Sequence, residues 1–195
     1  MANQSARNKV SLRERLQKRG PKKLLALDGG GIRGVLSLEI LRKLESLLRT
    51  TSGNADYRLA DYFDYISGTS TGGIIAAGLA IGMSVDKILE FYEQSGAQMF
   101  EPAKLRHRLS YHYQSEPLAK MLKCVFGGDT QLGSDSVETL LLLILRNATT
   151  DSPWPISNNP FAKYNHPGHP ACNLKFRLWQ LTAPPRRPTS RPRSS

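Results

Sequence analysis

The sequence has few cysteines, no long apolar run and, after residue 151, no acidic side chain. Two cysteines, Cys124 and Cys172, are too few for a disulfide framework and favour a reducing cytoplasm. The longest apolar runs, at 74–83 and 140–145, are too short to cross a bilayer. The charged N-terminus has no apolar segment behind it, so no secretory signal peptide is expected. These absences argue against a disulfide-rich secreted protein and against a membrane-spanning one.

The net charge of +11 comes from the two ends of the chain. Residues 1–23 hold eight Lys or Arg and one acid, and residues 152–195 hold seven Lys or Arg and no acid. Residues 24–151 hold twelve basic and fifteen acidic side chains, so the middle is slightly acidic. Basic ends of this kind either contact an anionic membrane surface or nucleic acid without specificity, or stay solvated. The charge therefore predicts no specific nucleic-acid partner and leaves peripheral membrane contact through the termini open.

Composition divides the chain into three parts. Residues 1–21 form a basic tail with a weak amphipathic pattern, residues 22–181 form the domain, and residues 182–195 form an Arg-, Pro- and Ser-rich tail of disordered composition. The basic, aromatic stretch 103–114 is either a solvated loop or a cover that contacts lipid headgroups.

Apolar patterning and turn residues predict alternating strands and helices within the domain. Strands are expected in three apolar runs, of which the first and last read as buried: 24–27, 62–66 and 139–146. Helices are expected in four periodic stretches: 35–48, 73–83, 84–100 and 115–126. The first helix has one apolar face and ends at Gly53; the face comprises Val35, Leu38, Leu41, Leu44, Leu47 and Leu48. Residues 152–173 predict a long loop and 174–181 a further ordered segment.

The most informative stretch is Gly68-Thr69-Ser70-Thr71-Gly72, a Gly-x-Ser-x-Gly pattern between an expected strand and an expected helix. This context is typical of a nucleophile elbow, in which a tight turn exposes the serine hydroxyl. The glycines Gly68 and Gly72 suit a turn that leaves no room for Cβ atoms. The pattern predicts Ser70 as a nucleophile, with the free N–H groups of the following helix directed at the reacting centre.

A second glycine-rich stretch, Asp28-Gly29-Gly30-Gly31-Ile32-Arg33-Gly34, follows the first strand. Its spacing also fits a dinucleotide-binding loop, but the acid that such a site needs about twenty residues later is not at a strand end. The backbone N–H groups of Gly29, Gly30 and Gly31 can instead approach an oxyanion closely, and Arg33 adds positive charge. An anion-binding loop on one strand and a serine elbow on the next make a coherent acyl-transfer site.

These two motifs, in this order, resemble the patatin-like phospholipases. The lead-in at 61–64 and the Phe-Gly-Gly-Asp stretch beginning at Phe126 also match the family pattern, so the resemblance runs from about 22 to about 181. It implies an α/β fold, a patatin-like three-layer α/β/α arrangement around a central, mostly parallel sheet. It also implies a lipid acyl hydrolase without a cofactor, in which Ser70 is the nucleophile and Gly29–Gly31, with Arg33 nearby, form the oxyanion site.

The resemblance also implies a Ser–Asp dyad whose Asp lies in a later Asp-Gly motif. The only Asp-Gly in this sequence is Asp28-Gly29, which belongs to the glycine loop. The family pattern is therefore expected to break off near Thr182, which makes the fold incomplete at its C-terminus and leaves the base unassigned. The alternative function is a catalytically dead homologue that at most binds a lipid or a partner.

Two other arrangements remain as alternatives. An α/β-hydrolase triad would take its members in the order Ser, Asp, His, and the candidates are Asp129, Asp135 or Asp151 followed by His166 or His169. The spacing of His166, His169 and Cys172 also hints at a metal, but no fourth ligand is obvious and no metal is predicted.

Overall fold

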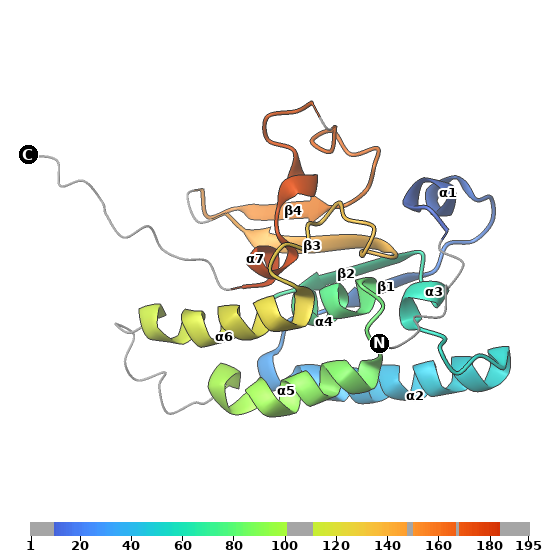
Figure 1. Cartoon of the computed structure of the whole chain (residues 1–195), viewed down its shortest axis with the longest axis horizontal. Coiled ribbons are helices and arrows are strands. Elements are labelled where there is room, and N and C mark those ends of the chain that lie inside the picture. Colours follow the sequence, from blue (N-terminus) through green and yellow to red (C-terminus); the bar gives the residue numbers. More distant parts are fainter. Residues whose placement is uncertain (1–9, 101–110, 148–149, 167, 184–195) are drawn as a thin grey trace, which may run out of the picture.

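The structure is a computed structural model that describes residues 10–100, 111–147, 150–166 and 168–183 (Figure 1). Within those ranges no helix combines the length and the apolar character needed to cross a membrane. The basic ends 1–9 and 184–195, and most of the basic, aromatic stretch 103–114, lie outside the described residues. The elements in chain order are α1 (Leu12–Gln17), β1 (Leu24–Leu27), η1 (Gly31–Arg33), α2 (Gly34–Ser52), α3 (Leu59–Tyr62), β2 (Tyr65–Thr69), α4 (Thr71–Ala80), α5 (Val85–Phe100), α6 (Tyr111–Phe126), β3 (Leu140–Arg146), β4 (Pro153–Ser157), η3 (Asn173–Lys175) and α7 (Leu178–Thr182).

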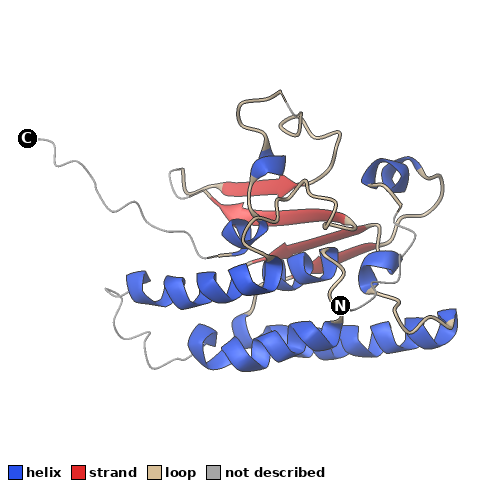
Figure 2. Ribbon diagram, in the orientation of Figure 1, coloured by secondary structure: helices blue, strands red, loops and turns tan. Residues whose placement is uncertain are grey.

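The centre of the fold is a four-stranded sheet in the order β1-β2-β3-β4 (Figure 2). The first three strands are parallel, and β4 pairs antiparallel with β3. The mixed α/β fold with a central, mostly parallel sheet that the sequence predicts is confirmed. Because β1 and β2 are parallel neighbours, the segments that follow their carboxyl ends lie next to each other, and these segments are the glycine loop and the serine elbow.

The hydrophobic core lies between the sheet and α4. Paired positions across the four strands, Leu27, Gly68, Leu143 and Ile156, are all buried on one side. Helix α4 packs directly against β1, β2 and β3 and is buried from Gly72 to Ala80. Helices α2 and α5 pack on each other below it in Figure 1, and α6 packs between α5 and α7. The elbow helix is therefore the most enclosed helix of the fold, which fixes the turn that precedes it.

Several boundaries differ from the sequence-based expectation. The strand before the elbow is Tyr65–Thr69 rather than 62–66, because Leu59–Tyr62 forms a short helix whose Asp61 carboxylate accepts the N–H of Arg58 at 2.9 Å. Helix α6 begins at Tyr111, before the expected residue 115. The prediction that the first strand is buried is wrong, since β1 is an edge strand and Leu24 is 70% exposed.

The prediction of a long loop over residues 152–173 is wrong in its first part, because Pro153–Ser157 forms β4. Two prolines in this segment argue for a loop, but β4 is an edge strand, where prolines are tolerated because half of the N–H groups need no partner in the sheet. Leu47 was expected on the inner face of α2 and instead faces outwards, 52% exposed.

Candidate active site

The backbone at Ser70 is strained. Its φ of 51° and ψ of −125° lie in the left-handed half of the map, which non-glycine residues rarely occupy. The glycines on either side allow this turn: a Cβ atom on Gly68 would lie 2.3 Å from the carbonyl oxygen of Gly72, and one on Gly72 would lie 2.3 Å from that of Leu27. The chain turns from β2 into α4 with no space for side chains at those two positions, which is the backbone form of a nucleophile elbow.

The glycine loop contacts this turn directly. A Cβ atom on Gly29 would lie 2.7 Å from the Cβ atom of Ser70. The N–H of Gly29 donates to Oγ1 of Thr69 at 2.9 Å, and the N–H groups of Gly30 and Gly31 both donate to Oγ1 of Thr71 at 3.1 Å. The hydroxyls on either side of Ser70 therefore hold the three amides against the elbow. The structure brings together the serine and the three glycines that the sequence singled out.

The far end of the glycine loop is held by packing. Gly31 has a φ of 59°, and η1 then leads into α2 with the exposed Arg33 at its N-terminal cap. A Cβ atom on Gly34 would lie 3.2 Å from the ring of Tyr92 on α5 and 3.4 Å from the side chain of Ile75 on α4. The loop is thus fixed at both ends, which limits how far its N–H groups can move from Ser70.

The carboxylates considered as substitutes for the dyad Asp are engaged or exposed. Asp129 pairs with Arg177 at 3.1 Å. Asp151 accepts a hydrogen bond from Arg146, which lowers the pKa of the Asp151 carboxyl. Asp135 is exposed. A base needs to reach the serine hydroxyl, and these contacts direct Asp129 and Asp151 towards arginines.

His166, His169 and Cys172, which the described ranges include, do not gather around a common point. His166 is exposed, whereas His169 accepts the N–H of Ala171 on Nδ1 at 3.1 Å and packs its ring against Tyr164. In the described part of the chain, no three His, Cys, Asp or Glu side chains gather closely enough to hold a metal ion.

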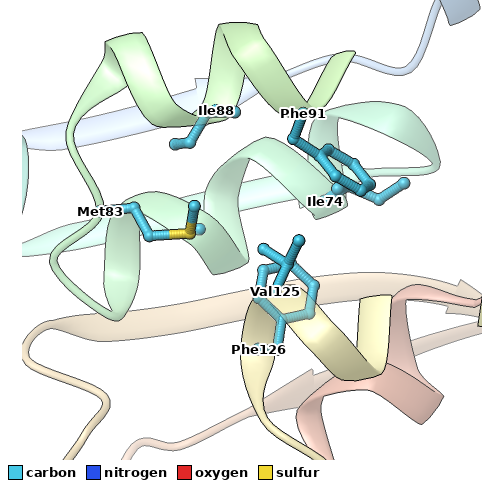
Figure 3. Close-up of a pocket in the computed structure, with 7 residues that line it drawn as sticks. Ile74, Met83, Ile88, Phe91, Val125 and Phe126 are labelled. Atoms are coloured by element: carbon cyan, nitrogen blue, oxygen red, sulfur yellow. The ribbon is translucent and has the colours of Figure 1, made fainter. Parts of the chain in front are cut away.

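An apolar pocket lies between α4, α5 and α6, beginning one helical turn after Ser70 at Ile74 (Figure 3). Its lining has no charged side chain and comprises Ile74, Gly78, Met83, Ile88, Phe91, Val125 and Phe126. The space is too narrow to admit a water molecule, so the pocket is part of the packed core.

The family assignment follows from the match of the chain to known sequences. The family model described as patatin-like phospholipase matches residues 25–181, which include the glycine loop and the elbow. The chain belongs to the patatin-like phospholipase family.

Relatives within this family include bacterial and plant proteins. A cGAMP-activated phospholipase of Vibrio cholerae serotype O1 is 32% identical over 142 residues, which are 67% of this chain and 39% of that protein. Patatin-17 of Solanum cardiophyllum is 44% identical over 87 residues, 41% of this chain and 22% of that protein. A potato protein named probable inactive patatin-3-Kuras 1 is 36% identical over 107 residues, 51% of this chain and 28% of that protein. The chain spans less than two fifths of the length of each of these relatives.

Among solved structures, a chain of the heterodimeric ExoU–SpcU complex from the type III secretion system of Pseudomonas aeruginosa has the same fold. The match has a TM-score of 0.50 at 18% identity and covers 84% of this chain and 36% of that one. This likeness supports the patatin-like arrangement of the sheet and helices.

Sequence reasoning missed Thr69, Thr71 and Tyr92 as parts of the site. The signal for the first two was present, since both variable positions of the Gly-x-Ser-x-Gly pattern are threonines. Tyr92 lies 21 residues after Thr71 on another helix, and no local pattern connects the two.

Proposed function

We propose that this chain hydrolyses acyl esters of phospholipids or related lipids, with Ser70 as the nucleophile. The observation that carries the proposal is the strained backbone of Ser70. Glycine is the common residue at such a position, because it adopts positive φ without strain, and strained non-glycine residues are concentrated at functional sites. Membership of the patatin-like phospholipase family supports a lipid ester as the substrate class.

In the proposed reaction, Oγ of Ser70 attacks the ester carbonyl carbon while its proton passes to a base. The carbonyl oxygen becomes an oxyanion, and collapse of this intermediate breaks the ester C–O bond, expels the alcohol with the proton returned by the base, and leaves an acyl-serine. Water then gives a proton to the same base and attacks the acyl group; the acyl C–Oγ bond breaks, the carboxylic acid leaves, and the proton restores the serine hydroxyl. The N-terminus of α4, a ten-residue helix that starts at Thr71, directs its positive dipole end towards the developing negative charge.

The amides of the glycine loop would stabilise the oxyanion. In this structure the N–H groups of Gly30 and Gly31 converge on one oxygen atom, Oγ1 of Thr71. Two donors on one oxygen is the arrangement that an oxyanion requires. A charged acceptor forms hydrogen bonds about twice as strong as those of a neutral hydroxyl, so we expect the oxyanion to displace the Thr71 hydroxyl from these amides. Arg33 would add positive charge beside them.

The alternative is a catalytically dead homologue that binds a lipid or a partner. It is supported by the pairing of Asp129 and Asp151 with arginines. The proposed hydrolysis needs a base within reach of Ser70, whereas binding does not.

Labelling with a fluorophosphonate separates the two functions. The wild-type chain should be labelled, Ser70→Ala should not, and the control Ser67→Ala, which removes a half-buried hydroxyl from the preceding strand, should be labelled as the wild type is. The wild type and Ser67→Ala should also turn over a short-chain ester, and Ser70→Ala should not. A folded wild-type chain that neither reacts with the probe nor turns over the ester would overturn the proposed hydrolysis and leave the binding function.

A further inference from the structure

The outward face of α2 is apolar. Leu36, Ile40 and Leu47 are 68%, 65% and 52% exposed. Steps of four and seven residues place them within about 40° of one line along a helix, because each residue turns the helix by about 100°. The opposite face of the same helix, with Leu38 and Leu41, is buried in the core. Helix α2 is thus apolar on two faces, and we refer to Leu36, Ile40 and Leu47 as the outer α2 stripe.

Charged side chains lie beside the outer α2 stripe, and its one acidic neighbour, Glu39, is paired with an arginine. Lys43 is exposed and lies beside the stripe, about 20° from Leu36 around the helix. Arg33 precedes the helix. Glu39 lies about 60° from Leu36 around the helix, and its carboxylate pairs with Arg42 at 2.6 Å. Large apolar side chains interspersed with lysine and arginine are typical of helices that lie in the interface of an anionic bilayer. A lysine beside such a stripe can bury its methylene groups and extend its ammonium to the headgroups.

The stripe begins close to the glycine loop. Leu36 lies in the first turn of α2, three residues after Arg33. The start of this helix is fixed against the elbow helix and α5, because Gly34 packs against Ile75 and Tyr92. A surface that docks on the outer α2 stripe therefore lies within about one helical turn, or 5.4 Å along the axis, of the glycine loop at that end.

We propose that the outer α2 stripe docks on the surface of an anionic lipid membrane. The choice of a lipid surface over a protein partner rests on the proposed function, since a lipid hydrolase must meet its substrate at such a surface. Three side chains are also far fewer than the roughly 20–30 residues that each partner contributes to a stable interface.

Sedimentation of the full 195-residue chain with vesicles tests the proposal. The wild type should bind vesicles of phosphatidylcholine and phosphatidylglycerol more tightly than vesicles of phosphatidylcholine alone. The double variant Leu36→Gln/Ile40→Gln should bind the mixed vesicles at least about tenfold more weakly, because it removes two side chains from the apolar contact. Leu47→Gln, about three and a half turns away from the glycine loop, should weaken binding in the same direction. Lys43→Gln should weaken binding to the anionic vesicles only.

The matched control is Phe161→Gln, which removes a side chain that is 53% exposed from a loop after β4. It should bind vesicles as the wild type does, and circular dichroism should show that all variants are folded. Equal binding by the wild type and the double variant would overturn the proposal, as would a wild type that does not bind. A dimer in solution that the double variant dissociates, without vesicle binding, would assign the stripe to a second copy instead.

These outcomes are separable from those of the proposed hydrolysis. If vesicle binding depends on the stripe but the fluorophosphonate does not label the chain, the docking proposal stands and the hydrolysis proposal is overturned. If the fluorophosphonate labels Ser70 but the chain does not bind vesicles, the hydrolysis proposal stands and the docking proposal is overturned.

Discussion

The hydroxyl of Tyr92 donates a hydrogen bond of 2.7 Å to the carbonyl oxygen of Thr71, the residue that follows Ser70. Burial raises the pKa of Tyr92 well above its ordinary value of 10.0, so this hydroxyl remains protonated and a donor throughout the physiological range. The bond connects α5 to the first turn of α4. The position of the elbow therefore depends on a side chain from a helix that contributes no group to the proposed chemistry.

Tyr92→Phe should destabilise the fold and slow the reaction of Ser70. It removes one hydrogen bond with little change in shape, so we expect the free energy of unfolding to fall by about 1 kcal/mol. Fluorophosphonate labelling should slow because the first turn of α4 loses a restraint. Urea unfolding and the labelling rate check the two effects. The control Tyr164→Phe, which removes a hydroxyl from a half-exposed residue, should change neither, and a comparable loss in both variants would contradict the role of Tyr92.

Gly72→Ala should disrupt the elbow, whereas Gly73→Ala should be tolerated. The added Cβ atom at Gly72 would lie 2.3 Å from the carbonyl oxygen of Leu27 and 2.7 Å from that of Asp28, so β1 and α4 would have to separate. At Gly73 the nearest atom, at 3.4 Å, belongs to the side chain of Leu143, which can move. Overpacking of this kind costs about 1–3 kcal/mol, while alanine within a helix gains up to about 1 kcal/mol over glycine. Gly72→Ala should therefore lower both the unfolding temperature and the rate of fluorophosphonate labelling, whereas Gly73→Ala should lower neither. Equal losses in the two variants would show that the backbone can shift to accommodate a Cβ atom at Gly72.

Thr71→Val should loosen the glycine loop, and Thr71→Ser should not. Valine keeps the shape of threonine but cannot accept the N–H groups of Gly30 and Gly31, which now donate to Oγ1 of Thr71. With about 0.5–1.5 kcal/mol per hydrogen bond, we expect the valine variant to lose about 1–2 kcal/mol in urea unfolding. Hydrogen exchange of the two glycine amides should become faster. Serine retains the hydroxyl, so a serine variant that exchanges as fast as the valine variant would argue against these bonds.

The elements of the site could be predicted from sequence, but the contacts that hold them could not. Gly68, Ser70 and Gly72 form a local pattern, and the turn they make follows from steric limits on a few neighbouring residues. The bonds from Gly29 to Thr69 and from Gly30 to Thr71 join residues about 40 positions apart. They depend on the parallel pairing of β1 with β2, which no short stretch of sequence specifies.

The errors in the fold prediction have a similar cause. The periodicity of apolar residues shows which side chains share a face of a helix or strand, but not whether another part of the fold packs against that face. Leu24 and Leu47 were both expected to be buried, and both are exposed, since one lies on an edge strand and the other on the outer face of α2. The prolines of β4 argue locally for a loop, and only its position at the edge of the sheet makes the strand acceptable.

Glu45→Gln should change how stability depends on pH. The Glu45 side chain is only 1% exposed, and its Oε2 accepts the N–H of Val85 at 3.1 Å and a guanidinium N–H of Arg49 at 2.6 Å. Within the described residues its Oε1 has no hydrogen-bond partner. Burial is the largest effect and raises the pKa of the Glu45 carboxyl above its ordinary value of 4.5, although both contacts lower it. Folding therefore favours the protonated acid.

Since the folded pKa of Glu45 is raised, the stabilisation from its protonated form is fully present below pH 4.5 and is lost as the pH rises through the folded value. Glutamine cannot ionise, so the stability of the variant relative to the wild type should increase between pH 4 and pH 7 in urea unfolding, on the order of 1 kcal/mol for each unit of raised pKa. Glu39→Gln removes a charge from the exposed side of the same helix and controls for the general effect of charge. If the free energies of unfolding of Glu45→Gln and Glu39→Gln depended on pH in the same way, the burial of the Glu45 carboxylate would not limit stability.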